Sequence, residues 1–161
     1  MSVNQTTTSK PTGVVKSSTQ SIEGLIEQRL KDSDRRYTSG RKKVVELLIQ
    51  AGDPVSITDI NSMCPELPRS SVYRHLVELE DSGIVQRITT NDEFFRYELT
   101  EEITGHHHHL ICIKCGKVVD VRLDGSIEAE LNKSINLLAK AGEFVPHGHR
   151  LDILGMCPLC S

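Results

Sequence analysis

The sequence predicts an α+β chain of two small units, the first helical with a terminal β-hairpin and the second a short sheet with one helix. One observation is that apolar residues recur at helical spacing in the N-terminal half. Two short alternating runs follow these segments. Finally, Cys112 and Cys115 form a Cys-x-x-Cys pair that Cys157 and Cys160 repeat at the end of the chain. The expected divisions are a disordered arm at residues 1–20, a first unit at 21–100, a hinge at 101–105 and a second unit at 106–161.

Length and composition fit two small units better than one large core. The chain has 161 residues, of which 37% are hydrophobic and none is Trp, so a bound metal ion would stabilise the second unit. Neither an apolar run of about 18 residues nor a signal peptide is present. We therefore expect a soluble, cytoplasmic protein with no membrane partner. In a reducing cytosol, paired cysteines are metal ligands more often than disulfides, whereas Cys64 has no partner spacing and is expected to be a buried thiol.

The first two helices are expected where apolar residues share one face. Residues 1–20 are rich in Ser, Thr, Gln and Lys and are too polar to bury a core, which predicts the disordered arm. Residues 21–30 carry Ile and Leu at helical spacing and predict the first helix. A second helix is expected over residues 41–51, and it should stop at the breaker sequence Gly52-Asp53-Pro54.

Two further helices and a hairpin complete the first unit. Ser56 can cap a third helix that runs to residue 63. A fourth helix opens at Pro68 and presents three apolar residues on its inward face, Val72, Leu76 and Leu79. Residues 84–89 and 94–99 then alternate as two strands around a polar turn. Three helices followed by a hairpin are the layout of a winged helix-turn-helix.

A basic segment precedes the second helix although the whole chain is slightly acidic. The formal net charge of −3 argues against nucleic acid, but residues 29–43 hold seven Lys and Arg against two Asp. Such a cluster can contact phosphates if one face presents it, and a solvated charged loop is the alternative. On the winged-helix layout the fourth helix enters the major groove of double-stranded DNA. The candidate contacts are Arg36, Arg41, Ser70, Ser71, Tyr73, Arg74 and Arg87, with a half-buried packing role equally open for Tyr73.

Four consecutive histidines, residues 106–109, open the second unit. They are not an affinity tag, because the run is internal and leads directly into an apolar, β-branched segment. Strands are expected at residues 109–113 and 118–122, a helix over 124–142 and a last strand within 143–156. A small sheet with an exposed edge is a poor isolated domain. We therefore expect a second copy of the chain to complete it as a homodimer.

The second unit has the residues for more than one metal site. Two Cys-x-x-Cys pairs have the ligand spacing of a tetrahedral Zn²⁺ site. In an extended run, His106 and His108 face one way and His107 and His109 the other, so this run can serve two sites. His149 shares a face with apolar residues of the expected last strand, and a core histidine is the alternative there. Mixed imidazole and carboxylate ligation suits Fe²⁺, Mn²⁺, Zn²⁺ or Ni²⁺. The carboxylates available on nearby elements are Glu98, Glu101, Glu102, Asp120 and Glu128.

Several segments together make the chain resemble the ferric uptake regulator (Fur) family. They are the run from His106 through Cys112 and Cys115 to Asp120, Ser126-Ile127-Glu128, the spacing from His149 to Cys157, and Ser71-Val72-Tyr73-Arg74-His75-Leu76 with Ser82-Gly83-Ile84-Val85. The likeness covers about residues 30–160. It implies a dimeric, metal-loaded transcriptional repressor with a winged-helix domain and a dimerisation domain. It also implies a structural Zn²⁺ bound by Cys112, Cys115, Cys157 and Cys160.

The resemblance further implies one or two more divalent metals per subunit. A site within the dimerisation domain is implied at His106, His108, Glu128 and His149. A regulatory site at the junction of the two domains is implied at Glu98, His107 and His109, with Asp120 as a further candidate. Tyr73 and Arg74 match the family's base- and phosphate-contacting pair, and Arg36 matches its minor-groove basic residue.

The chain also departs from the patterns of both main subfamilies. Iron-sensing members often have a His just before the third helix, where this chain has Asp53-Pro54-Val55. Zinc-sensing members often have a Cys near Leu99 and an Asp near Gln86, and both are missing here. The carboxylates implied at the junction favour Fe²⁺ as co-repressor. A zinc-uptake, other divalent-metal or peroxide-sensing regulator of the same family is the alternative.

No enzymatic activity and no small-molecule substrate are expected. A zinc hydrolase needs an open three-ligand site with a nearby general base, and the chain has no His-Glu-x-x-His helix. A zinc-ribbon module that binds protein is a second alternative. A regulator would bind duplex DNA in a salt-sensitive way and only with a divalent metal. This behaviour would distinguish it from a zinc hydrolase and from a protein-binding zinc ribbon.

Overall fold

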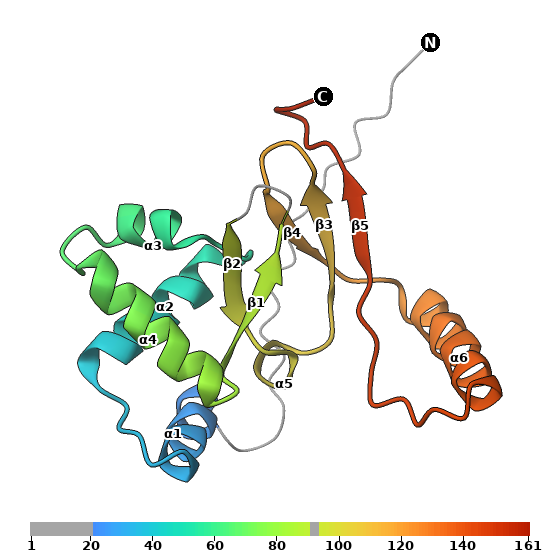
Figure 1. Cartoon of the computed structure of the whole chain (residues 1–161), viewed down its shortest axis with the longest axis horizontal. Coiled ribbons are helices and arrows are strands. Elements are labelled where there is room, and N and C mark those ends of the chain that lie inside the picture. The colour runs from blue at the N-terminus through green and yellow to red at the C-terminus, as the bar shows by residue number, and fades with distance from the viewer. Residues whose placement is uncertain (1–20, 91–93) are drawn as a thin grey trace.

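The computed structural model describes residues 21–90 and 94–161 (Figure 1). The predicted arm at residues 1–20 and most of the predicted hairpin turn lie outside the described residues. The helices are α1 (Ile22–Asp32), α2 (Ser39–Ala51), α3 (Ile57–Met63), α4 (Arg69–Asp81), α5 (Glu101–Thr104) and α6 (Gly125–Ala141). The strands are β1 (Val85–Thr89), β2 (Phe95–Leu99), β3 (His108–Cys112), β4 (Val118–Val121) and β5 (Asp152–Gly155). None of the helices in the described ranges has the length and apolar character that a membrane crossing requires.

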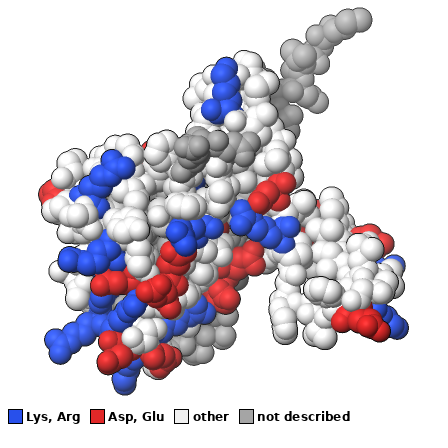
Figure 2. Space-filling model, viewed as in Figure 1, with Lys and Arg blue, Asp and Glu red and all other residues white. Residues whose placement is uncertain are grey.

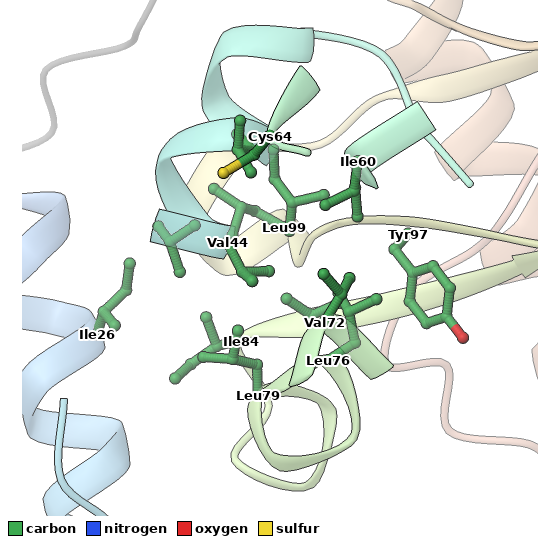
Figure 3. Close-up of a cluster of buried hydrophobic side chains, with 14 of the residues drawn as sticks. Ile26, Val44, Ile60, Cys64, Val72, Leu76, Leu79, Ile84, Tyr97 and Leu99 are labelled. Atoms are coloured by element: carbon green, nitrogen blue, oxygen red, sulfur yellow. The ribbon is translucent and has the colours of Figure 1, made fainter. Parts of the chain in front are cut away.

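In the helical unit, capping and helix-ending residues set the ends of the helices, and their apolar faces pack together. Ser56 and Asp59 make the reciprocal hydrogen bonds of a capping box at the start of α3. Gly52 ends α2 with a φ of +70°, a backbone conformation that favours glycine. The inward faces of α1 to α4 meet in one core, which Figure 3 shows. Its side chains include Ile26, Val44, Ile60, Cys64, Val72, Leu76 and Leu79.

The hairpin β1–β2 is the element that joins the two halves of the molecule. The strands pair antiparallel, with Val85 opposite Leu99. On one face of β2, Tyr97 and Leu99 belong to the helical core. On the other face, Arg96 and Glu98 are also buried. Glu98 contacts His107 and His109 at the start of β3, and Arg96 contacts the backbone of Cys115 between β3 and β4. A strand whose polar face looks solvent-exposed in the sequence is therefore buried on both sides.

The second sheet has the strand order β4-β3-β5. β3 pairs antiparallel with β4 and parallel with β5, which returns after the long α6. Ile88 of the hairpin packs with Ile111 and Val118 of this sheet in a small separate cluster. The segment predicted to be a hinge contains the single-turn helix α5.

Helix α6 stands away from the rest of the chain (Figure 1). It begins after Asp124, whose carboxylate accepts a hydrogen bond from Ser126 N, and ends before Gly142. No residue of α6 is buried, and its apolar residue Leu138 is 74% exposed. An apolar helix face of this kind needs cover from another surface.

Truncation of Leu76 to Ala should lower the free energy of unfolding by about 2–5 kcal/mol, because the side chain is fully buried and a cavity would remain. The matched control is Val77→Ala on the partly exposed face of the same helix, which should change stability by about 0.5 kcal/mol or less. Urea unfolding of both variants measures the difference. Equal losses would show that α4 does not pack as described.

Candidate metal centres

The structure brings together three groups of metal-ligand side chains. In each group one ligand atom per residue lies within 4.8 Å of every other. They are the cysteine cluster (Cys112, Cys115, Cys157, Cys160), the junction cluster (Glu98, His107, His109, Asp120) and the helix cluster (His106, His108, Glu128, His149). These are the three sets that the sequence assigned to metals. That they bind ions stays a prediction, which the chemistry of each cluster supports.

The cysteine cluster joins two turns that are distant in the sequence. Cys115 Sγ and Cys157 Sγ are 3.8 Å apart, close to the sulfur–sulfur distance of about 3.8 Å in a regular tetrahedron with Zn–S bonds of about 2.3 Å. All four thiols are free. Backbone amides of Cys157, Cys115 and Lys114 lower the pKa of Cys112 to about 6, so one thiolate is already favoured. The arrangement fits a structural Zn²⁺.

The junction cluster lies where the hairpin meets the second sheet. Glu98 comes from β2, and strand alternation sends His107 and His109 toward it from the start of β3. His107 Nε2 is 3.0 Å from Glu98 Oε2, and His109 Nε2 is 3.2 Å from Glu98 Oε1. Asp120 of β4 lies opposite His109 in the register, with its carboxylate 3.7 to 3.8 Å from both imidazoles.

Hydrogen bonds and charges within the junction cluster shift the pKa values of its members. Burial disfavours ionisation of Glu98, but hydrogen bonds from His107, His109 and Gln86 outweigh it and lower the pKa to about 2. The hydrogen bond to Glu98 raises the pKa of His107 to about 9 despite burial. Burial, followed by the charge of Glu98, raises the pKa of Asp120 to about 6. A divalent cation would replace the imidazolium protons as the charge that balances both carboxylates.

Glu128 is the centre of the helix cluster. Its carboxylate is 2.9 Å from His108 Nε2, 3.2 Å from His149 Nε2 and 3.3 Å from His106 Nε2. The hydrogen bond from His108 is the main cause of its lowered pKa. His149 lies three residues before β5 begins, not on the last strand as the sequence suggested, because that strand is only four residues long. A loop therefore delivers this imidazole to α6.

Several ligand atoms in these clusters lack a hydrogen-bond partner. Among buried atoms of the described residues, His108 Nδ1, Asp120 Oδ1 and His149 Nε2 are unsatisfied. His149 Nε2 is within ion-pair distance of Glu128 but lacks hydrogen-bond geometry. Buried polar atoms without partners are costly. A cation in the junction cluster would satisfy Asp120 Oδ1, and a second cation in the helix cluster would satisfy His149 Nε2. The residues present therefore fit bound metal ions.

The contacts that three residues make around the junction cluster could not be predicted from the sequence. Gln86 Nε2 donates to Glu98 Oε1 at 2.6 Å, and Asp152 Oδ1 accepts from His109 Nδ1 at 3.1 Å. Asp53, in the loop after α2, accepts from the backbone N–H of Asp120 at 3.2 Å. The family resemblance marked the positions of Asp53 and Gln86 only as departures from the subfamily patterns, and no motif marks Asp152. Each contact depends on which elements become neighbours.

The candidate DNA contacts gather around the first turns of α4. Ser70, Tyr73 and Arg74 are exposed there, and Tyr73 is 58% exposed rather than packed. Lys and Arg side chains, mixed with acidic ones, are concentrated over the helical unit (Figure 2). This surface could meet a DNA groove.

Of the other candidates, Ser71 is half-buried and Arg36 is exposed before α2. Arg87 pairs with Glu80 at 2.6 Å. Arg41 differs most from expectation, since Glu78 of α4 holds its Nη2 at 2.8 Å and only 11% of its side chain is exposed. A phosphate contact by Arg41 would require it to leave this carboxylate.

A winged helix beside three clusters of metal-ligand residues defines a DNA-binding, metal-responsive regulator as the class of this protein. The chain belongs to the ferric uptake regulator family, whose family model matches residues 32–154. This confirms the family resemblance and the α+β fold with a winged-helix domain and a dimerisation domain.

Relatives within the family carry several functional names. The peroxide operon regulator of Bacillus subtilis is 31% identical over 83% of this chain and 90% of its own length. The ferric uptake regulation protein of the same organism is 30% identical over 84% and 92%. The structure of the Helicobacter pylori ferric uptake regulator, described as having three functional metal binding sites, has a TM-score of 0.66 and 26% identity and covers 88% of this chain and 94% of that one.

Metal binding at the junction cluster should strengthen as the pH rises from about 6 to about 9. His107 binds a metal only as neutral imidazole, and its raised pKa of about 9 means that each ion bound at neutral pH must displace a proton. Below this pKa the apparent affinity should therefore fall, by about tenfold per pH unit for each proton displaced. Calorimetric titration with Mn²⁺ in buffers of different ionisation enthalpy measures the protons released. The control is His147→Gln, an exposed histidine outside all three clusters, and an affinity that is flat from pH 7 to 9 would contradict the assignment.

Proposed function

We propose that this protein is a homodimeric transcriptional repressor that binds its DNA operator when a divalent metal occupies the junction cluster. The observation that carries the proposal is that this cluster takes Glu98 from the hairpin of the helical unit. Its other residues come from β3, the position just before β3, and β4. A ligand bound there must contact both units. Its occupancy can therefore influence how the DNA-binding helix is oriented.

In this proposal Glu98, His107, His109 and Asp120 hold the metal, which supplies positive charge between two buried carboxylates. Without it, the negative charges of Glu98 and Asp120 are balanced only by protonated imidazoles. Burial, followed by the charge of Glu98, raises the pKa of Asp120 to about 6. Metal binding stabilises the DNA-competent conformation only to the extent that this conformation binds the metal more tightly than other conformations do. Because Tyr97 of β2 also belongs to the core against α4, fixing β2 fixes the frame that carries α4.

A second copy of the chain would cover the exposed face of α6 and the neighbouring loop. Leu137, Leu138, Phe144 and Val145 are all more than 60% exposed, which a stable isolated subunit would rarely show. Twofold pairing would place two copies of α4 on one side of the assembly. Dimeric winged-helix and helix-turn-helix proteins read half-sites about one helical turn apart in this way.

We propose Fe²⁺ as the co-repressor, with structural Zn²⁺ in the cysteine cluster. The junction cluster offers two imidazoles and two carboxylates. Such nitrogen and oxygen donors suit Fe²⁺ or Mn²⁺, whereas thiolate-rich sites select Zn²⁺. A relative named for ferric uptake supports this choice. The helix cluster, with three imidazoles and one carboxylate, is suited to Zn²⁺ or Ni²⁺ as well as Fe²⁺.

Peroxide sensing is a second candidate, because the peroxide operon regulator matches this chain at least as well as the iron regulator does. Two histidines and a carboxylate with open positions are the ligand set of oxygen-reactive Fe²⁺ sites. Loss of DNA binding after peroxide treatment of the Fe²⁺ form, but not of the Mn²⁺ form, would favour this function. Retention of DNA binding by both forms would favour iron sensing.

The double substitution His107→Ala with His109→Ala should abolish metal-dependent DNA binding and leave one zinc per chain in the cysteine cluster. Duplexes are first selected from a random pool with wild-type protein and Mn²⁺ or Fe²⁺, and binding is then measured with and without metal. His147→Ala provides the matched control, since it removes an imidazole outside the clusters. An unchanged metal response in the double variant would exclude the junction cluster as the sensor.

Substitution of Arg74 by Ala should weaken DNA binding and reduce the slope of log affinity against log salt by about one, the effect of losing one phosphate contact. Lys133→Ala, on α6 and 70% exposed, removes the same charge far from the proposed DNA surface and should leave the slope unchanged. The salt dependence of binding to the selected duplexes gives both values. A similar loss in both variants would point to net charge rather than to contact by Arg74.

A further inference from the structure

The side chain behind His109 is a carboxylate from the last strand of the chain. Asp152 is the register partner of His109 in the parallel pairing of β3 with β5. Its Oδ1 is 3.1 Å from His109 Nδ1, on the side of the ring away from Glu98. A carboxylate can only accept, so this contact keeps a ring proton on Nδ1. Nε2, whose proton faces Glu98, is then the ring atom that a metal ion in the junction cluster would bind in place of that proton.

Asp152 is itself held in place by Arg150. The guanidinium Nε is 3.0 Å from Oδ1 and Nη2 is 2.8 Å from Oδ2, a two-point contact that fixes the plane of the carboxylate. Burial disfavours its charge, but Arg150 and then His109 keep the pKa of Asp152 below its usual value. A series of contacts therefore leads from the surface to the junction cluster, through Arg150, Asp152 and His109.

The two junction imidazoles are oriented by different means. His107 Nδ1 lies 2.9 Å from the backbone carbonyl of Gly105, an acceptor that no substitution of side chains can remove. His109 instead depends on a charged side chain carried by β5, the strand that ends two residues before Cys157. The strand that completes the cysteine cluster therefore also orients a ligand of the junction cluster.

We propose that Asp152 is a positioning residue for metal binding at the junction cluster, acting by fixing the tautomer and direction of His109. The inference rests on the proposed function only in assigning a metal to this cluster. A carboxylate behind a metal-bound imidazole raises the basicity of the ligand and fixes its orientation, and loss of such a partner typically lowers metal affinity about 10- to 100-fold.

The test is a Co²⁺ titration of zinc-loaded full-length protein, followed by the visible absorption of the bound ion. All proteins carry His149→Ala, which removes one residue of the helix cluster, so that the titration reports the junction cluster. Asp152→Asn keeps the shape of the side chain but can present an amide N–H₂ to Nδ1. It should weaken Co²⁺ binding about 10- to 100-fold and alter the paramagnetically shifted, exchangeable Nδ1 proton signal of His109. The matched control Glu130→Gln, which removes an exposed carboxylate on α6, should change neither.

Equal Co²⁺ affinity in Asp152→Asn and its parent would overturn the proposal. So would loss of zinc from the cysteine cluster in that variant, because the effect would then be loss of β5 structure, which zinc content and circular dichroism report. An equal loss of Co²⁺ affinity in Glu130→Gln would also overturn it, because the loss in Asp152→Asn would then be an effect of net charge. Failure of the proposed function is distinguishable, since Co²⁺ would then bind the wild-type cluster without changing its DNA binding.

Discussion

The structure depends most on the buried carboxylate of Glu98 and its two imidazole partners. Only 6% of Glu98 is exposed, so its charge has lost most of its hydration and must be balanced from within the protein. His107 and His109 supply this balance across the boundary between the hairpin and the second sheet. A buried ion pair of this kind contributes little net stability, yet it is costly to break. It therefore acts mainly to hold β2 in one position against β3.

Strand β2 links this interaction to the DNA-binding surface because both of its faces are occupied. Glu98 and Arg96 face the second sheet, and Tyr97 and Leu99 face the helical core. The Val55–Tyr97 bridge ties the same strand to the segment between α2 and α3. Asp53, next to that segment, contacts the backbone of β4. The helical unit is thus attached to the second sheet at two separate points beside the junction cluster.

Much of the fold could be predicted because its signals are local. The cap at Ser56, the breaker at Gly52 and the inward face of α4 depend only on neighbours in the chain, and the structure has all three. Local patterns could not reveal that residues 101–104 form a helical turn or that His149 precedes β5. Nor could they show that Glu78 engages Arg41, since the two lie 37 residues apart and meet only when α2 packs on α4.

The sequence by itself determined which atoms could bind metal and on which side of each element they lie. Two Cys-x-x-Cys turns and a run of histidines suffice for this, because a strand alternates its side chains whatever surrounds it. The family resemblance implied Glu98, Asp120 and Glu128 as further ligands, but only the tertiary structure showed that they lie with the histidines and that Asp152 lies behind His109. Glu98, Asp120, Glu128 and Asp152 come from four elements that carry no shared spacing, and an isolated carboxylate looks the same at a ligand position as on a solvated surface. These carboxylates become neighbours of the histidines because β2, β4, β5 and α6 all lie next to the start of β3.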